Sequence, residues 1–307
     1  MEIKWFRPKQ EGGESRKTEE EDDQLSQQKE SYYITIPDHV ETQYVSSSNP
    51  SNNVNDIPQA ESIVVDLSKV QQRIAKKKGK QEQVEVCDKN VVVINKVSKN
   101  VSKDTSSIKR IGGYTSKHMI LLVGEGDFSF SACLALAFGS ASNIIATSLN
   151  SQEFLTQNYG NFLNNKMELE KRGGVILYGI NAKTMVKDLV IGILKFDRII
   201  FNFPHCGKFR RTDADMRANK ELIRGFLRNA KKMINEDGEI HITHKTNGYF
   251  LQWDIPKIGS DQGLRLIQEV KFKRSKYPRY NTKFGFGGDK DFECNPCTTY
   301  KFGMCTE

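Results

Sequence analysis

Residues 119–130 read MILLVGEGDFSF, an apolar run followed by a turn that contains two glycines. The five apolar residues 119–123 predict a strand buried on both faces of a parallel sheet, because such a strand has no polar face. The residues after the turn, 129–138, have helical spacing that stops at Gly139. A buried strand, a tight turn and a helix in this order are typical of an α/β domain.

The same alternation continues towards the C-terminus. Further strands are predicted at 143–148, 175–178, 196–203, 239–244, 264–273 and 298–302, and further helices at 152–171, 185–194, 213–234 and 255–263. This order predicts an α/β domain from about residue 118 onward, with a mostly parallel sheet and helices on both faces. Right-handed crossovers place the carboxyl ends of parallel strands at one edge of the sheet, where ligands bind.

Residues 1–110 differ in composition. Charged and polar side chains dominate them, and such a segment buries too little apolar surface to offset the entropy of ordering. We expect most of it to be disordered, with two apolar islands at 62–67 and 91–94 that could be short strands or docking segments. The lysine run at 76–80 could be a nuclear-import or nucleic-acid patch, or part of a solvated linker.

The chain has 307 residues, with 46 Lys and Arg against 38 Asp and Glu, and a formal net charge of +8. Acidic and basic residues balance in 1–110, so the excess lies in the predicted domain. A basic domain favours polyanionic partners, although ordinary surface charge explains it equally well. The six cysteines form no disulfide framework, and no apolar run is long enough for a membrane helix. We therefore expect a soluble, intracellular protein.

The turn at 124–127 is the first candidate for a binding site. Gly124 and Gly126 lack a Cβ and would let a cofactor approach the backbone, and the following helix would offer N–H groups to a carboxylate or phosphate. Ser129 replaces the third glycine of a dinucleotide loop, and no phosphate-loop lysine follows. These departures favour S-adenosylmethionine, whose ammonium group Glu125 and Asp127 could bind. The alternative is a plain strand-to-helix turn.

Asparagines follow the next two predicted strands. Asn150 lies where a side chain commonly binds the ribose hydroxyls of a nucleoside cofactor, and Asn181 lies where a side chain could bind adenine. An amide has one acceptor oxygen and no charge, so it is a weaker acceptor than a carboxylate. Either asparagine could instead cap a helix.

The sequence Asn202-Phe203-Pro204-His205 follows the fourth predicted strand. It resembles the Asn/Asp-Pro-Pro-Tyr/Phe loops of methyltransferases that modify amino or ring nitrogens. In this interpretation Asn202 orients the target nitrogen and His205 accepts a proton at neutral pH. The alternative is a proline-containing loop with a solvated histidine.

Basic side chains gather near the ends of the fourth and fifth strands, where they would surround the pocket mouth and contact phosphates. The candidates are Lys208, Arg210, Arg211, His244 and Lys245. Ordinary surface charge is the alternative.

Residues 277–281 mix aromatic and basic groups and could stack on nucleotides or pack as a loop over the sheet. Cys294, Cys297 and Cys305 lack an obvious fourth ligand, so we expect no metal site.

Five segments together resemble the Rossmann-like domain of 25S rRNA (uridine-N3)-methyltransferase-like proteins, and the chain looks like a plant member. They are 120–130 (ILLVGEGDFSF), 146–149 (ATSL), 196–205 (FDRIIFNFPH), 224–230 (RGFLRNA) and 243–246 (THKT). The resemblance covers roughly residues 117–303 and runs in order through the predicted domain.

The resemblance implies an S-adenosylmethionine-dependent enzyme that methylates N3 of a uridine in large-subunit ribosomal RNA. It also implies RNA or a pre-ribosomal particle as partner and a nuclear or nucleolar location, with the cytoplasm as alternative. The residues that match the family's motifs are Gly124, Glu125, Gly126, Asp127 and Phe128 in the cofactor turn, Asn202, Pro204 and His205 after strand four, and His244 and Lys245 after strand five. His205 or a water molecule would remove the N3 proton while Asn202 positions the base.

Two departures from the family pattern concern Asn150 and Asn181, where the family usually has Asp. Each lost charge-assisted hydrogen bond removes about 1.5–3 kcal/mol, so affinity for the cofactor falls about a hundredfold or more if both are lost. A second hypothesis follows, that the chain is a catalytically weakened paralogue that still binds RNA. A nicotinamide-dependent oxidoreductase is disfavoured by the missing third glycine and by the absence of an acidic residue at position 150.

Overall fold

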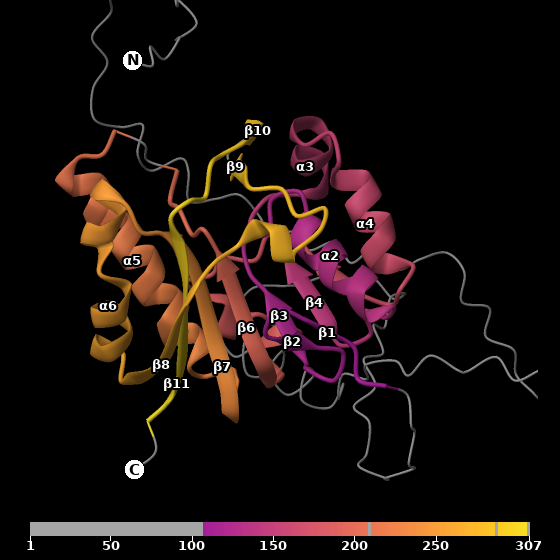
Figure 1. Cartoon of the computed structure of the whole chain (residues 1–307), viewed down its shortest axis with the longest axis horizontal. Helices are drawn as coiled ribbons and strands as arrows, with labels where there is room; N and C mark the ends of the chain where they lie inside the picture. The colour runs from indigo at the N-terminus through magenta and orange to yellow at the C-terminus, as the bar shows by residue number, and fades with distance from the viewer. Residues whose placement is uncertain (1–106, 208–209, 286–287, 306–307) are drawn as a thin grey trace, which may run out of the picture. The chain divides into compact units, whose positions relative to one another are not determined.

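A computed structural model of the chain describes residues 107–207, 210–285 and 288–305 (Figure 1). The predictions for residues 1–106, which include both apolar islands and the lysine run at 76–80, lie outside the described residues. Lys208 lies outside them as well.

A seven-stranded sheet in the order β5-β4-β3-β6-β7-β11-β8 forms the centre of the domain. Its strands are β3 (Ile120–Leu122), β4 (Ile144–Thr147), β5 (Val175–Leu177), β6 (Phe196–Asn202), β7 (Ile234–Lys245), β8 (Leu264–Lys271) and β11 (Cys297–Met304). The first five in chain order pair in parallel, as the alternation predicts. The last strand, β11, lies antiparallel between β7 and β8, so β8 runs in the same direction as β7.

Helices cover both faces of the sheet and confirm the predicted α/β fold. Their bounds are α2 (Ser129–Phe138), α3 (Gln152–Asn158), α4 (Phe162–Glu170), α5 (Asp213–Ala230) and α6 (Ile255–Asp261). Figure 1 shows α2 and α4 on one side of the sheet and α5 and α6 on the other. The buried side chains form one core on each face, with Leu121 in the first and Ile120 and Leu122 in the second. The strand predicted as buried on both faces is therefore β3.

Two predicted helices are wrong in detail. The single helix predicted at 152–171 is divided into α3 and α4, because Tyr159 has an extended backbone with φ −130° and ψ 109°. The helix predicted at 185–194 consists of two 3-10 turns, η2 (Met185–Lys187) and η3 (Ile191–Ile193). Between them Asp188 Oδ1 accepts hydrogen bonds from the N–H groups of Val190 and Ile191, which competes with helix continuation.

Several short elements have no counterpart in the sequence predictions. They are the hairpin of β1 (Arg110–Ile111) and β2 (Tyr114–Thr115), the 3-10 helices η4 (Gly248–Trp253) and η5 (Arg274–Lys276), and the hairpin of β9 (Lys283–Gly285) and β10 (Gly288–Asp291). A buried hydrogen bond joins the first hairpin to β7, because Tyr114 Oη lies 2.9 Å from His241 Nδ1. His241 Nε2 lies 2.6 Å from a carboxylate oxygen of Glu239, so both ring nitrogens have partners.

The contact between α6 and β11 generates a prediction about stability. A Cβ added to the buried Gly259 would lie 2.2 Å from Cε1 of Phe302, whose ring is fully buried. We expect Gly259→Ala to lower the free energy of unfolding by about 2 kcal/mol, measured by urea denaturation. Ser260→Ala at the exposed neighbouring position is the control, with an expected change within about 0.5 kcal/mol. A Gly259→Ala protein as stable as the native chain would contradict this packing.

Candidate active site

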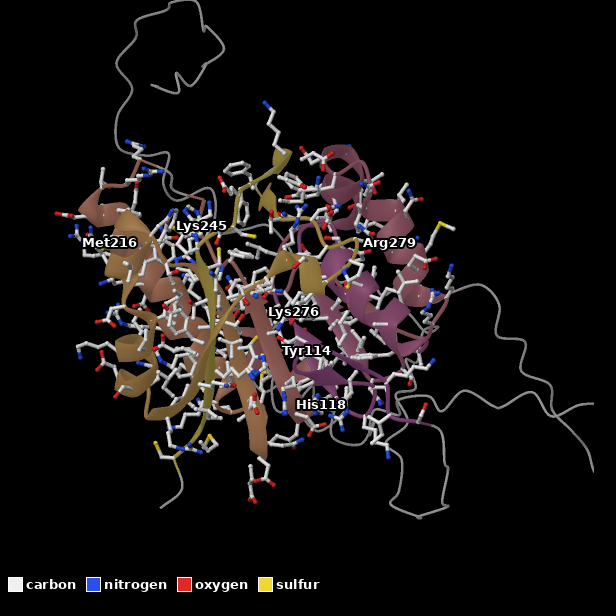
Figure 2. The ribbon with its side chains drawn as sticks, viewed as in Figure 1. Tyr114, His118, Met216, Lys245, Lys276 and Arg279 are labelled. Atoms are coloured by element: carbon white, nitrogen blue, oxygen red, sulfur yellow. The ribbon has the colours of Figure 1, made fainter. Side chains whose placement is uncertain are left out.

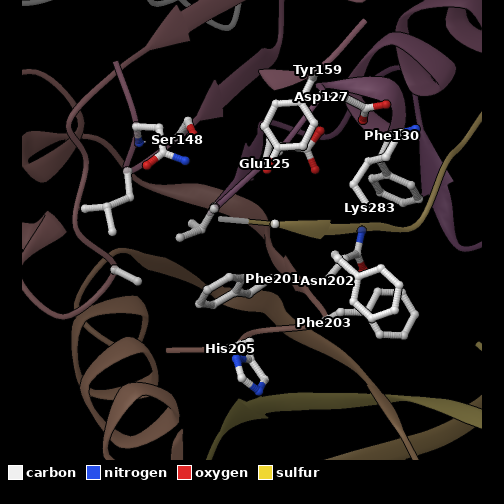
Figure 3. Close-up of a pocket in the computed structure, with 18 of the residues that line it drawn as sticks. Glu125, Asp127, Phe130, Ser148, Tyr159, Phe201, Asn202, Phe203, His205 and Lys283 are labelled. Atoms are coloured by element: carbon white, nitrogen blue, oxygen red, sulfur yellow. Dashed lines mark hydrogen bonds between the residues drawn. The ribbon is translucent and has the colours of Figure 1, made fainter. Parts of the chain in front are cut away.

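A pocket opens at the carboxyl ends of the parallel strands β3, β4, β5 and β6 (Figure 3). Its walls are the residues that follow these strands and a later segment, 280–292. Most of the predicted cofactor and catalytic residues line it, namely Gly124, Glu125, Gly126, Asp127, Asn150, Asn181, Asn202 and His205. The structure thus brings together residues from four strand ends, while their individual roles remain predictions.

The turn after β3 requires glycine at its first position. Gly124 has φ +68°, and a Cβ there would lie 2.5 Å from Cε2 of Phe201. At Gly126 an added Cβ would lie 3.7 Å from the Tyr159 ring, which is ordinary contact. The backbone of this turn therefore lines the pocket directly, as the sequence predicts.

The N-terminal end of α2 is occupied by the chain's own carboxylates. The Ser129 N–H donates to Asp127 Oδ1 at 3.0 Å, and the Ser131 N–H donates to Glu125 Oε2 at 3.1 Å. These carboxylates lie at the positive end of the helix dipole. The expectation that these N–H groups would meet a ligand's carboxylate or phosphate is corrected by this geometry, because two of them already have partners.

The acidic side chains in the turn can accept a cationic donor. Burial raises the pKa of Glu125 to about 7 and also raises the pKa of Asp127. Asp127 Oδ2 is buried and has no hydrogen-bond partner among the described residues. A buried oxygen of this kind is expected to have a partner, and an ammonium group would be a charge-assisted one. These carboxylate acceptors therefore fit the ammonium group of S-adenosylmethionine's amino-acid end.

The two asparagines differ in their local bonding. The Asn181 Oδ1 accepts a hydrogen bond from the Lys183 N–H at 2.9 Å, so its oxygen already stabilises the turn after β5. At Asn150 the backbone N–H donates to Ser148 Oγ at 3.3 Å. Both asparagines line the pocket, but within the described residues only the side-chain oxygen of Asn181 accepts a hydrogen bond from its own turn.

The end of β6 presents an amide and a neutral imidazole to the pocket. Both amide atoms of Asn202 are buried without a hydrogen-bond partner among the described residues. His205 Nδ1 accepts a hydrogen bond from the Gly207 N–H at 3.0 Å, and burial lowers the pKa of His205 to about 4. A neutral ring with an accepting Nδ1 carries its proton on Nε2. Pro204 is buried and lies outside the pocket lining.

The remaining predicted residues lie in different surroundings. His244 is 3% exposed, its ring centroid is 4.3 Å from that of Trp253, and burial lowers its pKa to about 3. A buried, uncharged ring does not fit the predicted phosphate contact. Lys245 is half-buried, with Nζ 4.3 Å from the ring centroid of Phe292. Arg210 and Arg211 are exposed in the loop after β6.

Phe128, predicted to belong to the cofactor turn, is fully buried and does not line the pocket. Its ring packs against Phe162 and Tyr178, with centroids 5.7 and 6.4 Å away. Phe128 adopts the left-handed conformation, with φ 58°, at the N-cap of α2. Its position in the motif therefore reflects packing beneath the turn.

Residues 280–285 and 288–292 include a wall of the pocket, of which the sequence predictions singled out only Tyr280 and Asn281, within the segment 277–281. Its lining residues are Tyr280, Asn281, Lys283, Phe284, Gly285 and Phe292. The Asn281 N–H donates to Ser129 Oγ at 3.0 Å, and the Phe292 and Phe203 rings meet edge to face with centroids 4.9 Å apart. The aromatic residues Tyr280, Phe284 and Phe292 were the sequence signal that could have indicated this wall. They follow neither helical nor strand periodicity, so the sequence did not predict an element here.

No helix within the described part of the chain has the length and apolar character needed to span a membrane. Among the same residues, no three His, Cys, Asp or Glu side chains gather in a way that could hold a metal ion.

Comparison with known proteins identifies relatives of this chain. A family model described as "BMT5-like: rRNA (uridine-N3-)-methyltransferase BTM5-like" matches residues 121–284. "Uncharacterized protein At4g26485" from Arabidopsis thaliana is 49% identical over 203 residues, which are 64% of this chain and 97% of that protein. "Heavy metal-associated isoprenylated plant protein 41" from the same plant is 42% identical over 193 residues, 62% of this chain and 38% of that protein.

Among solved structures, a TehB-like SAM-dependent methyltransferase from Corynebacterium glutamicum aligns with 61% of this chain and 79% of its own length. The sequence identity is 15% and the TM-score is 0.37. A similarity at this level carries no argument about the reaction.

The buried carboxyl of Glu125 generates a pH prediction. Because its pKa rises on folding from an ordinary value near 4.5 to about 7, its ionisation disfavours the folded state as pH rises through this range. We expect the unfolding free energy of Glu125→Gln, relative to the native chain, to increase by about 3 kcal/mol between pH ~4 and pH ~8. Urea denaturation at both pH values measures it, and Glu236→Gln at an exposed position is the control. An equal pH dependence in all three proteins would contradict the raised pKa.

Proposed function

The chain belongs to the BMT5-like family of rRNA (uridine-N3-)-methyltransferases, and on this premise we propose that it methylates N3 of a uridine in large-subunit ribosomal RNA with S-adenosylmethionine as donor. The matched residues 121–284 include most of the pocket lining. The bound cofactor supplies an activated methyl group on a sulfonium. The chain's own residues hold it and present the base.

The observation that carries the proposal is the amide of Asn202, which is buried, unpartnered among the described residues and placed in the same pocket as the turn at 124–127. Its Nδ2 can donate to a carbonyl oxygen of uracil while N3 faces the cofactor. Figure 3 shows Glu125 and Asp127 on one side of the pocket and Asn202 and His205 on the other. The cofactor's amino-acid end and the base therefore have separate binding groups.

His205 acts in this proposal as a hydrogen-bond donor. Its Nδ1 accepts from the Gly207 N–H and its pKa is about 4, so the neutral ring carries its proton on Nε2, which we propose donates to a second uracil carbonyl. When N3 loses its proton, negative charge spreads to both carbonyl oxygens, and the two donors stabilise it. The N3–H bond would break with its proton passing to water. N3 would then bond to the methyl carbon as the bond between that carbon and the sulfonium sulfur breaks, leaving a neutral thioether.

A second candidate function is RNA binding by a catalytically weakened paralogue, which the neutral side chains of Asn150 and Asn181 favour. Both functions place the protein with ribosomal RNA or a pre-ribosomal particle. We propose a nucleolar location on the same basis, with the cytoplasm as alternative.

Calorimetric titration of S-adenosylmethionine into the full chain separates the two functions. Micromolar binding supports the enzyme, and binding no tighter than millimolar supports the weakened paralogue. We expect Asn150→Asp to increase affinity at least about tenfold by restoring a charged acceptor, and Asn181→Asp to increase it less because that oxygen already accepts from Lys183. Asn164→Asp, an exposed site on α4, adds the same charge outside the pocket and should change nothing. Equal effects at positions 150 and 164 would contradict this use of the pocket.

The methyl transfer itself is tested with tritiated S-adenosylmethionine and deproteinised large-subunit rRNA, followed by digestion to nucleosides and detection of 3-methyluridine. We expect Asn202→Ala to lower kcat/KM about a hundredfold with cofactor affinity retained, since one donor to the developing charge is lost. His205→Asn keeps an N–H donor and should retain more activity than His205→Ala. Equal inactivity of the two His205 variants would contradict the donor role.

A further inference from the structure

The segment 271–279 carries five basic side chains and no acidic one. We name it the basic segment; its cations are Lys271, Lys273, Arg274, Lys276 and Arg279, and all five are exposed. The aromatic residues between and after them are turned inwards, since Phe272 and Tyr280 are each 8% exposed. This alternation differs from an ordinary solvated charge run, in which no side chain is fixed.

Inward-facing rings hold the backbone of the basic segment in place. Phe272 and Tyr277 are stacked with centroids 5.6 Å apart and planes at 8°, and Tyr277 also lies 5.0 Å from Phe130 on α2. The Phe272 N–H donates to the carbonyl oxygen of Cys297 on β11 at 2.8 Å. The predicted stacking of residues 277–281 on nucleotides is therefore replaced by the alternative, packing over the sheet. The groups of the basic segment that can still contact a partner are its exposed cationic side chains.

Three of the five cations have no acidic partner in the part of the chain that the structure describes. Within the described residues, no carboxylate lies within ion-pair distance of Lys271, Lys273 or Lys276. Arg274 differs, because its guanidinium lies 3.3 Å from a carboxylate oxygen of Asp291. Arg279 is close enough to Glu168 on α4 to lower the pKa of that carboxyl slightly, after larger effects of Lys171 and Arg172. The segment therefore keeps an uncompensated positive charge.

The basic segment begins at the carboxyl-end edge of the sheet and ends next to residues that line the pocket. Because β8 runs in the same direction as β6 and β7, its last residue, Lys271, lies at the sheet edge where the pocket opens. The segment leads directly to Tyr280 and Asn281, which line the pocket. Figure 2 shows Lys276 over the sheet and Arg279 towards the helices that flank it. The charges thus form a path from the sheet edge to the rim of the pocket.

This arrangement fits a chain of phosphates. Lysines without acidic partners gain most from contacts with phosphate oxygens, and such contacts position a nucleic acid without reading its sequence. An anionic membrane surface would also attract the charge, but interfacial segments insert exposed apolar side chains, and the rings of this segment are packed against the domain. The observations therefore favour a polynucleotide.

We propose that the basic segment binds the phosphate backbone of the RNA whose target nucleotide enters the pocket. The identity of that nucleotide rests on the proposed function, whereas the binding is measured without methyl transfer. Lys271, Lys273 and Lys276 make the phosphate contacts, and the stacked rings of Phe272 and Tyr277 hold their backbone.

The test compares two triple variants of the full chain. Lys271→Gln, Lys273→Gln and Lys276→Gln together remove the unpaired cations. The control variant carries Lys117→Gln, Lys195→Gln and Lys232→Gln. These lysines are exposed and precede β3, β6 and β7 at the opposite edge of the sheet. Binding of a fluorescein-labelled oligouridylate is followed by anisotropy across a series of KCl concentrations, and near-UV circular dichroism verifies folding.

We expect the slope of log affinity against log salt to become shallower by about 2 in the first variant, which corresponds to three phosphate contacts on a single strand. Affinity at about 0.1 M salt should fall on the order of a hundredfold, while the control variant keeps the native slope and affinity. Loss of oligouridylate binding in the first variant, with binding retained in the control variant, supports the proposal. This result does not depend on whether the native chain forms 3-methyluridine, so the proposed methyl transfer can fail while the proposed RNA binding holds.

Three results would overturn the proposal: no binding of oligouridylate by the native chain, equal salt slopes in the native chain and the first variant, or equal losses in both variants. Vesicles of phosphatidylcholine and phosphatidylserine test the other polyanionic surface. Vesicle binding that depends on the basic segment, without RNA binding, would also overturn it.

Discussion

The side chains of Glu125 and Asp127 fold back from the turn after β3 and accept hydrogen bonds from the N–H groups at the start of α2. Burial of two neighbouring carboxylates is costly, and the raised pKa of each reflects that cost. The helix dipole and the two N–H donors offset part of it. The second oxygen of Asp127 is left without a hydrogen-bond partner among the described residues.

The rest of the pocket is arranged by charge around this turn. The end of β6 contributes two neutral groups, the amide of Asn202 and an imidazole that burial keeps uncharged. Lys283 also lines the pocket, where its ammonium group is paired with Asp289 and Asp291, and further positive charge lies along the basic segment at the rim. A cationic sulfonium cofactor and an anionic RNA would therefore meet complementary potentials at separate places, and the uncharged base would lie between them.

The parts of the fold that follow from short-range pattern were predictable. β3 is a continuous apolar run, α2 has helical spacing with a glycine after its end, and the parallel order follows from alternation. The sequence did not predict the features of the fold that depend on contacts between distant segments. The insertion of β11 between β7 and β8 is a pairing between distant segments, and the β9–β10 hairpin is too short to show periodicity. The predicted family is confirmed by the family model over 121–284.

The candidate site divides in the same way. Residues at strand ends, such as Gly124 and Asn202, could be placed in one pocket because parallel strands share an edge. Burial could not be read from residue type, so His244 was grouped with surface cations although its ring lies against Trp253. The wall formed by 280–292 depends on contacts with α2 and β6 that no local pattern encodes.

The position of β11 has a consequence for how the protein is made. Among the described strands, β8 lies at the edge of the sheet and pairs with β11 alone, so it gains this partner only after residues 297–304 have left the ribosome. The loop between these two strands carries the rim of the pocket. The nascent chain can therefore assemble the five parallel strands and the turn at 124–127 first, whereas the outer wall waits for the last strand. We expect the turn at 124–127 to form earlier in the life of each molecule than the rim that the basic segment provides.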